Sequence, residues 1–270
     1  MGNSITDHTS NNVPRIISCI LLDLSQDRNK VCVVVEGIND YKLFKFVLSE
    51  NTKIFQSYSS DNVDKIVQYF DKNKRVIGIR DKDYLPKPIN ERCFFCDYSC
   101  AEMMIIAIDS CFSRLHCNYY KGEMDSAKLR IHCLERLEKL SKLRKLNACL
   151  NWHIRFDGTK PGKYYQNSID DMNNAIIADL NNQNSQNPID AERAKMCEEL
   201  PKCSKLQDYL LITNGHDFIN LFCHVAKTQC KQEEIGTTMR ATLGRSEFMS
   251  TDLYKDLLDY QNKNNITIVQ

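Results

Sequence analysis

The run of β-forming residues at 31–35 constrains the fold of this chain more than any other stretch. It reads Val-Cys-Val-Val-Val and ends on Glu36. A continuous apolar run of this length is typical of a strand buried on both faces, as in a parallel sheet. Gly37 allows a tight exit, and Asp40 can cap the helix predicted after it. Glu36 is therefore expected at the carboxyl end of a central strand, where open α/β sheets place their ligands.

Helices and strands are predicted to alternate over the first part of the chain. Strands are expected at 31–35, 53–58, 75–80 and 93–96, and helices at 13–24, 39–49, 59–70 and 101–115. Right-handed crossovers would bring the carboxyl ends of all these strands to one edge. The sequence therefore predicts an α/β fold built on a parallel sheet.

The rest of the chain is predicted to be mainly helical. Helices are expected at 123–147, 215–230, 234–243 and 251–261, strands at 151–156 and 266–270, and a linker at 181–187. The linker prediction rests on a run of asparagines closed by Pro188. No internal repeat is visible.

Carboxylates follow three of the four predicted strands. They are Glu36 and Asp40 after the first strand, Asp81 and Asp83 after the third, and Asp97 and Glu102 after the fourth. Mg²⁺ takes several oxygen ligands and keeps bound water, so a few carboxylates on one rim suffice to hold it. A helix cap is an equally good explanation for any single member. As a group they predict a site for Mg²⁺ or Mn²⁺.

The spacing of these acids resembles a known family. Val35-Glu36-Gly37 with Asp40, followed by Asp81-Lys82-Asp83 after an apolar strand, is similar to the Toprim fold of topoisomerases, primases and OLD-family nucleases. The spacing of Asp97 and Glu102 before an apolar helix, with segments at 214–218 and 248–254, resembles an OLD-like Toprim group. That group includes nuclease effectors of PARIS anti-phage defence systems. The resemblance covers 30–115 and parts of 210–262.

The resemblance implies a division of the chain and a role for each acid. It implies a Toprim-like catalytic core at 28–120, after a lead-in and helix at 1–27 and before a helical elaboration at 121–270. Glu36 would act as general acid/base or metal ligand, and Asp81 and Asp83 would be the metal-binding pair. The remaining acids, Asp40, Asp97 and Glu102, are candidates to complete the site. A lysine further along would steady charge at the phosphate, with Lys163 and His216 as the two candidates.

The same resemblance implies a function. It is that of a metal-dependent nuclease acting on phosphodiester bonds of RNA or DNA. The resemblance favours RNA, and tRNA in particular, whereas the residues themselves do not select RNA over DNA. Control would come from an ABC-type ATPase partner, and the released protein would form a homodimer. The alternatives are a non-catalytic scaffold that docks a partner, and a phosphatase built on Asp-x-Asp. The phosphatase is disfavoured because that motif would then follow the first strand, not the third.

The predicted helix at 123–147 carries a local excess of basic residues. Between Lys128 and Lys145, seven Lys or Arg stand against two Glu. Arg136, Lys139 and Lys142 are candidates to contact nucleic-acid phosphates or a partner. The alternatives are a solvated face and helix packing through the leucines of the same helix.

Composition adds few constraints. The chain has a net charge of +1, so overall electrostatics do not indicate a nucleic-acid-binding protein. Its 13 cysteines come without a secretory signal, which favours reduced thiols in the cytoplasm. Cys93, Cys96 and Cys100 are expected to be buried as small apolar residues, because no further ligand completes a zinc site. No apolar run is long enough for a membrane span.

Overall fold

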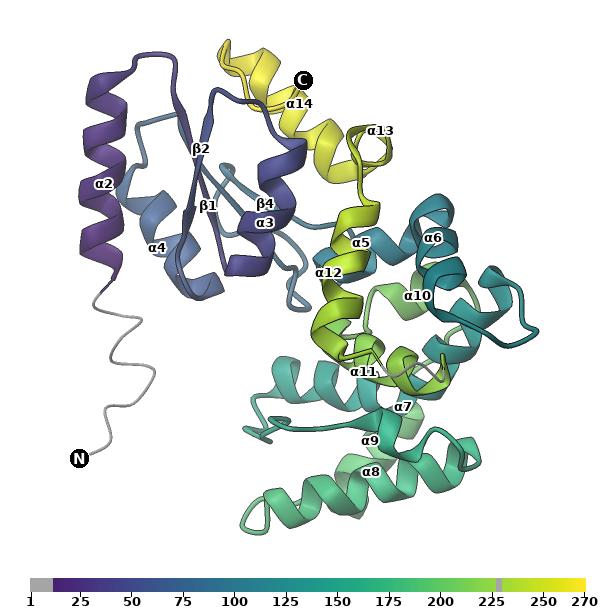
Figure 1. Ribbon diagram of the computed structural model, residues 1–270. Helices are drawn as coiled ribbons and strands as arrows, with labels where there is room; N and C mark the ends of the chain where they lie inside the picture. Colours follow the sequence, from purple (N-terminus) through teal and green to yellow (C-terminus); the bar gives the residue numbers. More distant parts are fainter. Residues whose placement is uncertain (1–11, 227–229) are drawn as a thin grey trace. The chain divides into compact units, whose positions relative to one another are not determined.

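The computed structural model describes residues 12–226 and 230–270 (Figure 1). The chain divides into two compact units. Of the described residues, the sheet unit comprises 12–100 and 243–270, and the helical unit comprises 101–226 and 230–242. The sequence had placed the boundary near residue 120 and all later residues in the helical part. Instead, the helical unit begins earlier, and the C-terminal segment belongs to the sheet unit.

The sheet unit is built on four parallel strands in the order β2-β1-β3-β4. Their bounds are β1 (Val31–Val35), β2 (Thr52–Gln56), β3 (Val76–Arg80) and β4 (Cys93–Phe95). Every residue of β1 and β3, the two inner strands, is buried, as expected for strands covered on both faces. The predicted α/β fold with a parallel sheet is confirmed.

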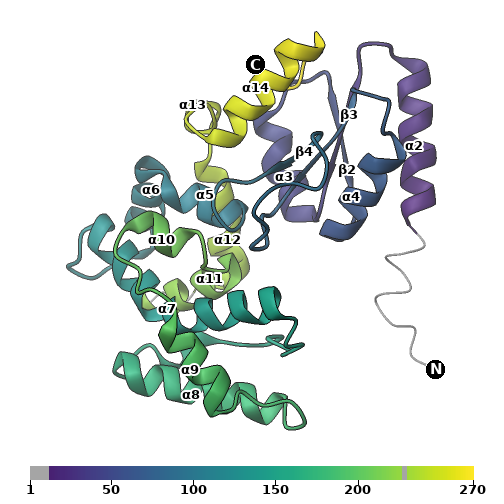
Figure 2. The same ribbon diagram turned by 180° about the vertical axis from the view of Figure 1, so that it is seen from behind.

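Helices cover both faces of this sheet (Figures 1 and 2). They are α2 (Val13–Gln26), α3 (Ile38–Val47), α4 (Ser60–Tyr69), α13 (Arg245–Phe248) and α14 (Asp252–Asn264). The crossovers from β1 to β2 and from β2 to β3 run in opposite directions across the sheet. Because such crossovers are right-handed, α3 and α4 belong on opposite faces. Helix α2 packs beside α4.

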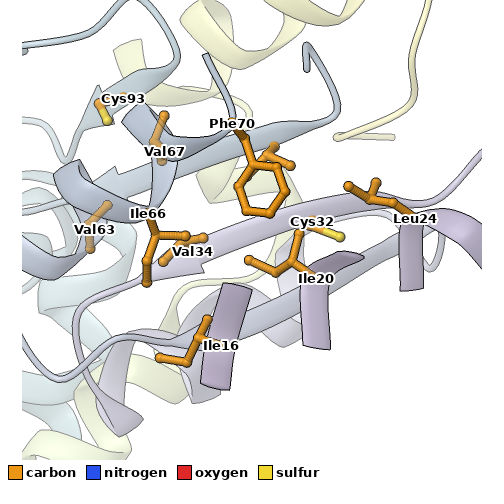
Figure 3. Packing of buried hydrophobic residues seen from close by; sticks show 11 residues of the cluster. Ile16, Ile20, Leu24, Cys32, Val34, Val63, Ile66, Val67, Phe70 and Cys93 are labelled. Carbon is orange, nitrogen blue, oxygen red and sulfur yellow. The ribbon is translucent and has the colours of Figure 1, made fainter. Parts of the chain in front are cut away.

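The face covered by α2 and α4 holds a continuous apolar core (Figure 3). Its side chains come from one stripe of each helix and from alternate strand positions: Ile16, Ile20, Leu24, Cys32, Val34, Val63, Ile66, Val67, Phe70, Val76 and Cys93. Gly78 of β3 lies under α4, where an added Cβ would stand 2.6 Å from a methyl of Val63. The close packing of α4 on β3 therefore depends on a glycine at this position.

The helical unit is organised around one long helix, α7 (Ser126–Leu150). The other elements are α5 (Ala101–Ala107), α6 (Asp109–Tyr119), the 3-10 helix η1 (Pro161–Tyr164), α8 (Ile169–Gln183), α9 (Ala191–Glu199), α10 (Leu206–Leu210), α11 (Gly215–Val225) and α12 (Gln232–Thr242). Six leucines of α7 are buried, and the helix packs against α6, α8, α9, α10 and α11. The helix predicted at 101–115 is two helices, because Ile108 has extended backbone angles between them.

Three expectations for irregular segments are wrong, and side-chain amides explain all three. Residues 151–156 form no strand; the Asn147 side chain binds both backbone groups of Ile154. The expected linker at 181–187 is held in place, since the Asn184 side chain binds both backbone groups of Arg155. The C-terminal segment is no edge strand; Gln261 accepts its backbone amides. In each case a side-chain amide satisfies backbone groups that no strand pairs.

No helix within the described ranges is both long and apolar enough to cross a bilayer. The predicted burial of three cysteines is confirmed, since Cys93, Cys96 and Cys100 are all at most 6 % exposed. Burial raises the pKa of Cys93 to about 12, which disfavours the thiolate that a metal would need.

Candidate metal centre

Glu36 and Asp81 leave two adjacent strands at the carboxyl edge of the sheet. Strands β1 and β3 pair in parallel with Val35 opposite Ile79, so the residues after them fall side by side. The Asp81 N–H donates a hydrogen bond of 2.9 Å to Oε1 of Glu36. The structure thus places the Glu36 carboxylate against the backbone of Asp81, 45 positions away in the sequence.

Glu36 lies in a place that disfavours its negative charge. Its pKa is raised from the ordinary 4.5 to about 7, mainly because burial removes water from the carboxylate. The charges of Asp83 and Asp40 raise it further, whereas the Asp81 amide and Arg80 lower it. A cation bound beside Glu36 would offset this effect by favouring the charged carboxylate.

Asp40 and Asp83 take different positions around Glu36. Asp40 caps α3, because its Oδ2 accepts the Gly37 N–H at 2.8 Å. Asp83 lies in the loop after β3, with a side chain that is 54 % exposed. The position of Asp40 is therefore compatible both with a helix cap and with a metal ligand.

Arg80 is the cation of this cluster, and the sequence did not single it out. Its side chain is only 5 % exposed. It pairs with Asp64 of α4 and, at 3.2 Å, with Asp83, and its Nε is 4.0 Å from Glu36. The other oxygen of Asp64 is buried without a hydrogen-bond partner among the described residues. A basic residue closing the buried run at 76–80 was the signal available in the sequence.

The loops that follow the strands hold side chains in unusual backbone conformations. Asp83, Tyr84, Tyr58 and Tyr98 all have positive φ, between 45° and 73°. Such conformations cost about 1–3 kcal/mol each for residues other than glycine and cluster at functional sites. Nothing in the sequence marks these tyrosines, because positive φ is ordinarily predicted only for glycine, asparagine and aspartate.

The donor atoms at this edge suit a hard divalent cation. Glu36, Asp81 and Asp83 offer carboxylate oxygens, the ligands that Mg²⁺ and Mn²⁺ prefer. Among the described residues, Arg80 is the buried arginine that balances them, and Asp64 shares it. The donor chemistry therefore fits the ion that the sequence predicts, but the carboxylates of Glu36, Asp81 and Asp83 do not all lie within ligand distance of one another among the described residues.

Asp97 has a different position from the one predicted for a metal ligand. Its two oxygens accept the backbone N–H groups of Asp252 and Leu253, at 2.9 and 2.8 Å. It thereby binds the first turn of α14 to the loop after β4. Both carboxylate oxygens are thus engaged in holding the C-terminal helix on the sheet unit.

We expect Asp97→Ala to lower the free energy of unfolding by about 1–2 kcal/mol, as the loss of a helix cap does. Asp97→Asn, which keeps one accepting oxygen, should cost less. Urea unfolding measures both changes, and calorimetry should find the Mg²⁺ affinity of both variants unchanged. A large loss of Mg²⁺ affinity in Asp97→Asn would show that Asp97 is a metal ligand.

Glu102, Lys163 and His216 belong to the helical unit, and their proposed roles stay predictions. Glu102 stands in the first turn of α5, packed so closely on Gly215 that an added Cβ there would lie 2.6 Å from its Oε2. The Lys163 side chain is 62 % exposed, 3.5 Å from Asp179. His216 is exposed in the first turn of α11.

The basic residues of α7 mostly point into the helical unit. Arg136 is 7 % exposed and donates to the carbonyls of Tyr165 and Asn167. The prediction that it contacts nucleic acid is therefore wrong, because its guanidinium is buried. Lys142 is also largely buried, with Nζ 2.7 Å from Glu138. Lys139 is 26 % exposed and lies 3.5 Å from Glu198, which weakens the prediction for it.

Taken together, the carboxyl edge of the sheet offers a carboxylate that titrates near neutral pH beside oxygen donors for a cation. Those are the parts that metal-assisted hydrolysis requires. Comparison of the chain with protein-family models, curated proteins and solved structures finds no match.

Proposed function

We propose that this protein is a Mg²⁺- or Mn²⁺-dependent nuclease with a Toprim-like catalytic core. The observation that supports this most is the Glu36 carboxylate, with a pKa of about 7, hydrogen-bonded to the Asp81 amide at the carboxyl edge of a parallel sheet. A carboxylate with a pKa near the working pH suits a general base. The excess of acids around it suits a cation-assisted reaction at a phosphate.

The residues would divide the work of hydrolysis. Because Oε1 of Glu36 accepts the Asp81 amide, Oε2 is the oxygen that can take the proton of the attacking water. The water oxygen then bonds to phosphorus, the bond to the leaving oxygen breaks, and solvent protonates that oxygen. Asp81 and Asp83 would hold the cation, which when bound polarises the phosphoryl oxygen and balances charge on the leaving oxygen. Arg80 positions Asp83 through their 3.2 Å contact.

Cleavage of single-stranded RNA, tRNA and DNA in Mg²⁺ or Mn²⁺ tests this proposal. We expect Glu36→Gln, Asp81→Asn and Asp83→Asn to lower the rate by about 10²–10⁴-fold, the size typical of a lost acid/base or charge-stabilising group. Calorimetry should show weaker Mg²⁺ binding in the two aspartate variants. Asp71→Asn, an exposed acid just after α4, is the matched control and should cleave like the wild type.

Wild-type rates in the double variant Asp81→Asn/Asp83→Asn would overturn the nuclease proposal. A wild type that binds oligonucleotides or a partner but cleaves nothing would favour the non-catalytic scaffold instead. The wider role is proposed from the sequence resemblance alone. In that role the protein is an anti-phage effector held by an ABC-type ATPase partner, and it dimerises on release.

A further inference from the structure

Three tyrosines follow the strands in a backbone conformation that tyrosine rarely adopts. Tyr58, Tyr84 and Tyr98 come after β2, β3 and β4, with φ of 73°, 65° and 64°. Where the ends of α7 and α14 need the same conformation, the chain has Asn151 and Asn265. Asparagine adopts it at a lower cost. The course of the backbone therefore does not by itself account for three aromatic rings at this edge.

The tyrosines bracket the candidate metal centre. The Tyr58 N–H donates to the Glu36 carbonyl at 2.7 Å, which places Tyr58 on the β2 side of that acid. Tyr84 directly follows Asp83 on the other side. The Lys82 N–H donates to the Ser99 carbonyl at 3.1 Å, which ties the loop carrying Tyr84 to the loop carrying Tyr98.

Solvent exposure and the spacing of the strands bear on whether a ligand can reach these rings. Tyr58 is 52 % exposed, although it is a large aromatic residue. Tyr84 and Tyr98 are partly exposed. Strands β2 and β4 are three strand spacings apart, about 14 Å. Tyr58 and Tyr98 would therefore meet different groups of one extended ligand that passes over Glu36.

We propose that these tyrosines stack on unpaired bases of a single-stranded nucleic acid, on both sides of the phosphate that reaches Glu36 and Asp81. This inference rests on the proposed nuclease function and names its substrate as an unpaired segment. Aromatic rings hold single strands by stacking with little dependence on sequence. A duplex cannot use them in this way, because its bases are already stacked on one another.

The most basic helix does not offer all its charges to a ligand, since Arg136 and Lys142 are engaged inside the helical unit. Exposed lysines remain elsewhere, Lys87 among them, so phosphate contacts and stacking would act together.

Binding of a labelled single strand of about 12 nucleotides tests the proposal, since this length covers a typical site. Fluorescence anisotropy is measured in EDTA, so that no cleavage occurs, with RNA and DNA strands in separate arms. We expect Tyr58→Leu and Tyr98→Leu to raise Kd by about 5- to 100-fold, the effect of losing one stacked base. Tyr58→Phe keeps the ring and should bind like the wild type. Tyr69→Leu, at a 60 % exposed tyrosine of α4, is the matched control and should also bind normally.

Tyr58→Asn distinguishes a lost ring contact from a loss of folding in the leucine variants. Asparagine suits the left-handed backbone, so this variant should melt no lower than the wild type and still lose affinity. Equal Kd values for the wild type and both leucine variants would overturn the stacking proposal. So would an abasic strand that binds as tightly as one with bases.

The outcome separates this inference from the nuclease proposal. Ring-dependent binding without any cleavage in Mg²⁺ would remove the nuclease and leave the stacking site. If all tyrosine variants cleave at the wild-type rate, the nuclease proposal stands and the stacking proposal is wrong. The polymer whose binding depends on the rings, RNA or DNA, identifies the substrate.

Discussion

Arg80→Met is expected to lower the free energy of unfolding by about 3–5 kcal/mol, the cost of removing one partner of a buried ion pair. The guanidinium is 5 % exposed and pairs with Asp64, whose side chain is only 13 % exposed. Without it, the Asp64 carboxylate stays buried and unpaired, and the negative charges of Glu36 and Asp83 lose their neighbour. Urea unfolding at neutral pH measures the change.

Two variants give this prediction its controls. Arg28→Met removes an exposed arginine and should change stability by less than about 0.5 kcal/mol. The double variant Arg80→Met/Asp64→Asn should recover part of the loss, because no unpaired charge remains buried. If Arg80→Met unfolds like Arg28→Met, the ion pair is not what holds β3 and α4 together at this edge.

Glu36→Gln is expected to stabilise the cation-free protein at pH 8 but not at pH 4. Folding raises the pKa of Glu36 from 4.5 to about 7, so the native state binds this proton more tightly than the unfolded chain does. The resulting contribution to stability is fully present below pH 4.5 and is lost as the pH rises through 7. At 1.36 kcal/mol per pKa unit, the loss at pH 8 is about 3 kcal/mol, and glutamine avoids it.

Thermal unfolding in EDTA across this pH range measures the difference between the wild type and Glu36→Gln. Glu50→Gln, at an exposed glutamate after α3, is the matched control and should follow the wild type. Added Mg²⁺ should reverse the order at pH 8, because binding to the native state stabilises only a protein that retains the site. Parallel pH curves for the wild type and Glu36→Gln would show that Glu36 is not held in the protonation state described above.

The short-range pattern of the sequence was sufficient for the sheet and for the pairing of its acids. The apolar run at 31–35 implied a strand covered on both faces, and β1 is buried throughout. The rule that parallel strands end at one edge then implied that Glu36 and Asp81 lie at the same edge, and the Asp81 backbone amide donates a hydrogen bond to the Glu36 carboxylate. These inferences succeed because run length and strand direction are properties of neighbouring residues.

Only the tertiary structure decided which partners the polar groups take. Asp97 binds the amide of Leu253, 156 positions away, which is why the C-terminal helix belongs with the sheet. Arg80 pairs with Asp64 of α4, and Arg136 donates to the Tyr165 carbonyl in the segment after α7. A charged residue has the same local pattern whether it faces water or a distant carbonyl. Neighbouring residues therefore decide that Glu36 and the loop after β3 share one edge of the sheet, whereas the burial of the charges is decided by segments that meet only in the folded chain.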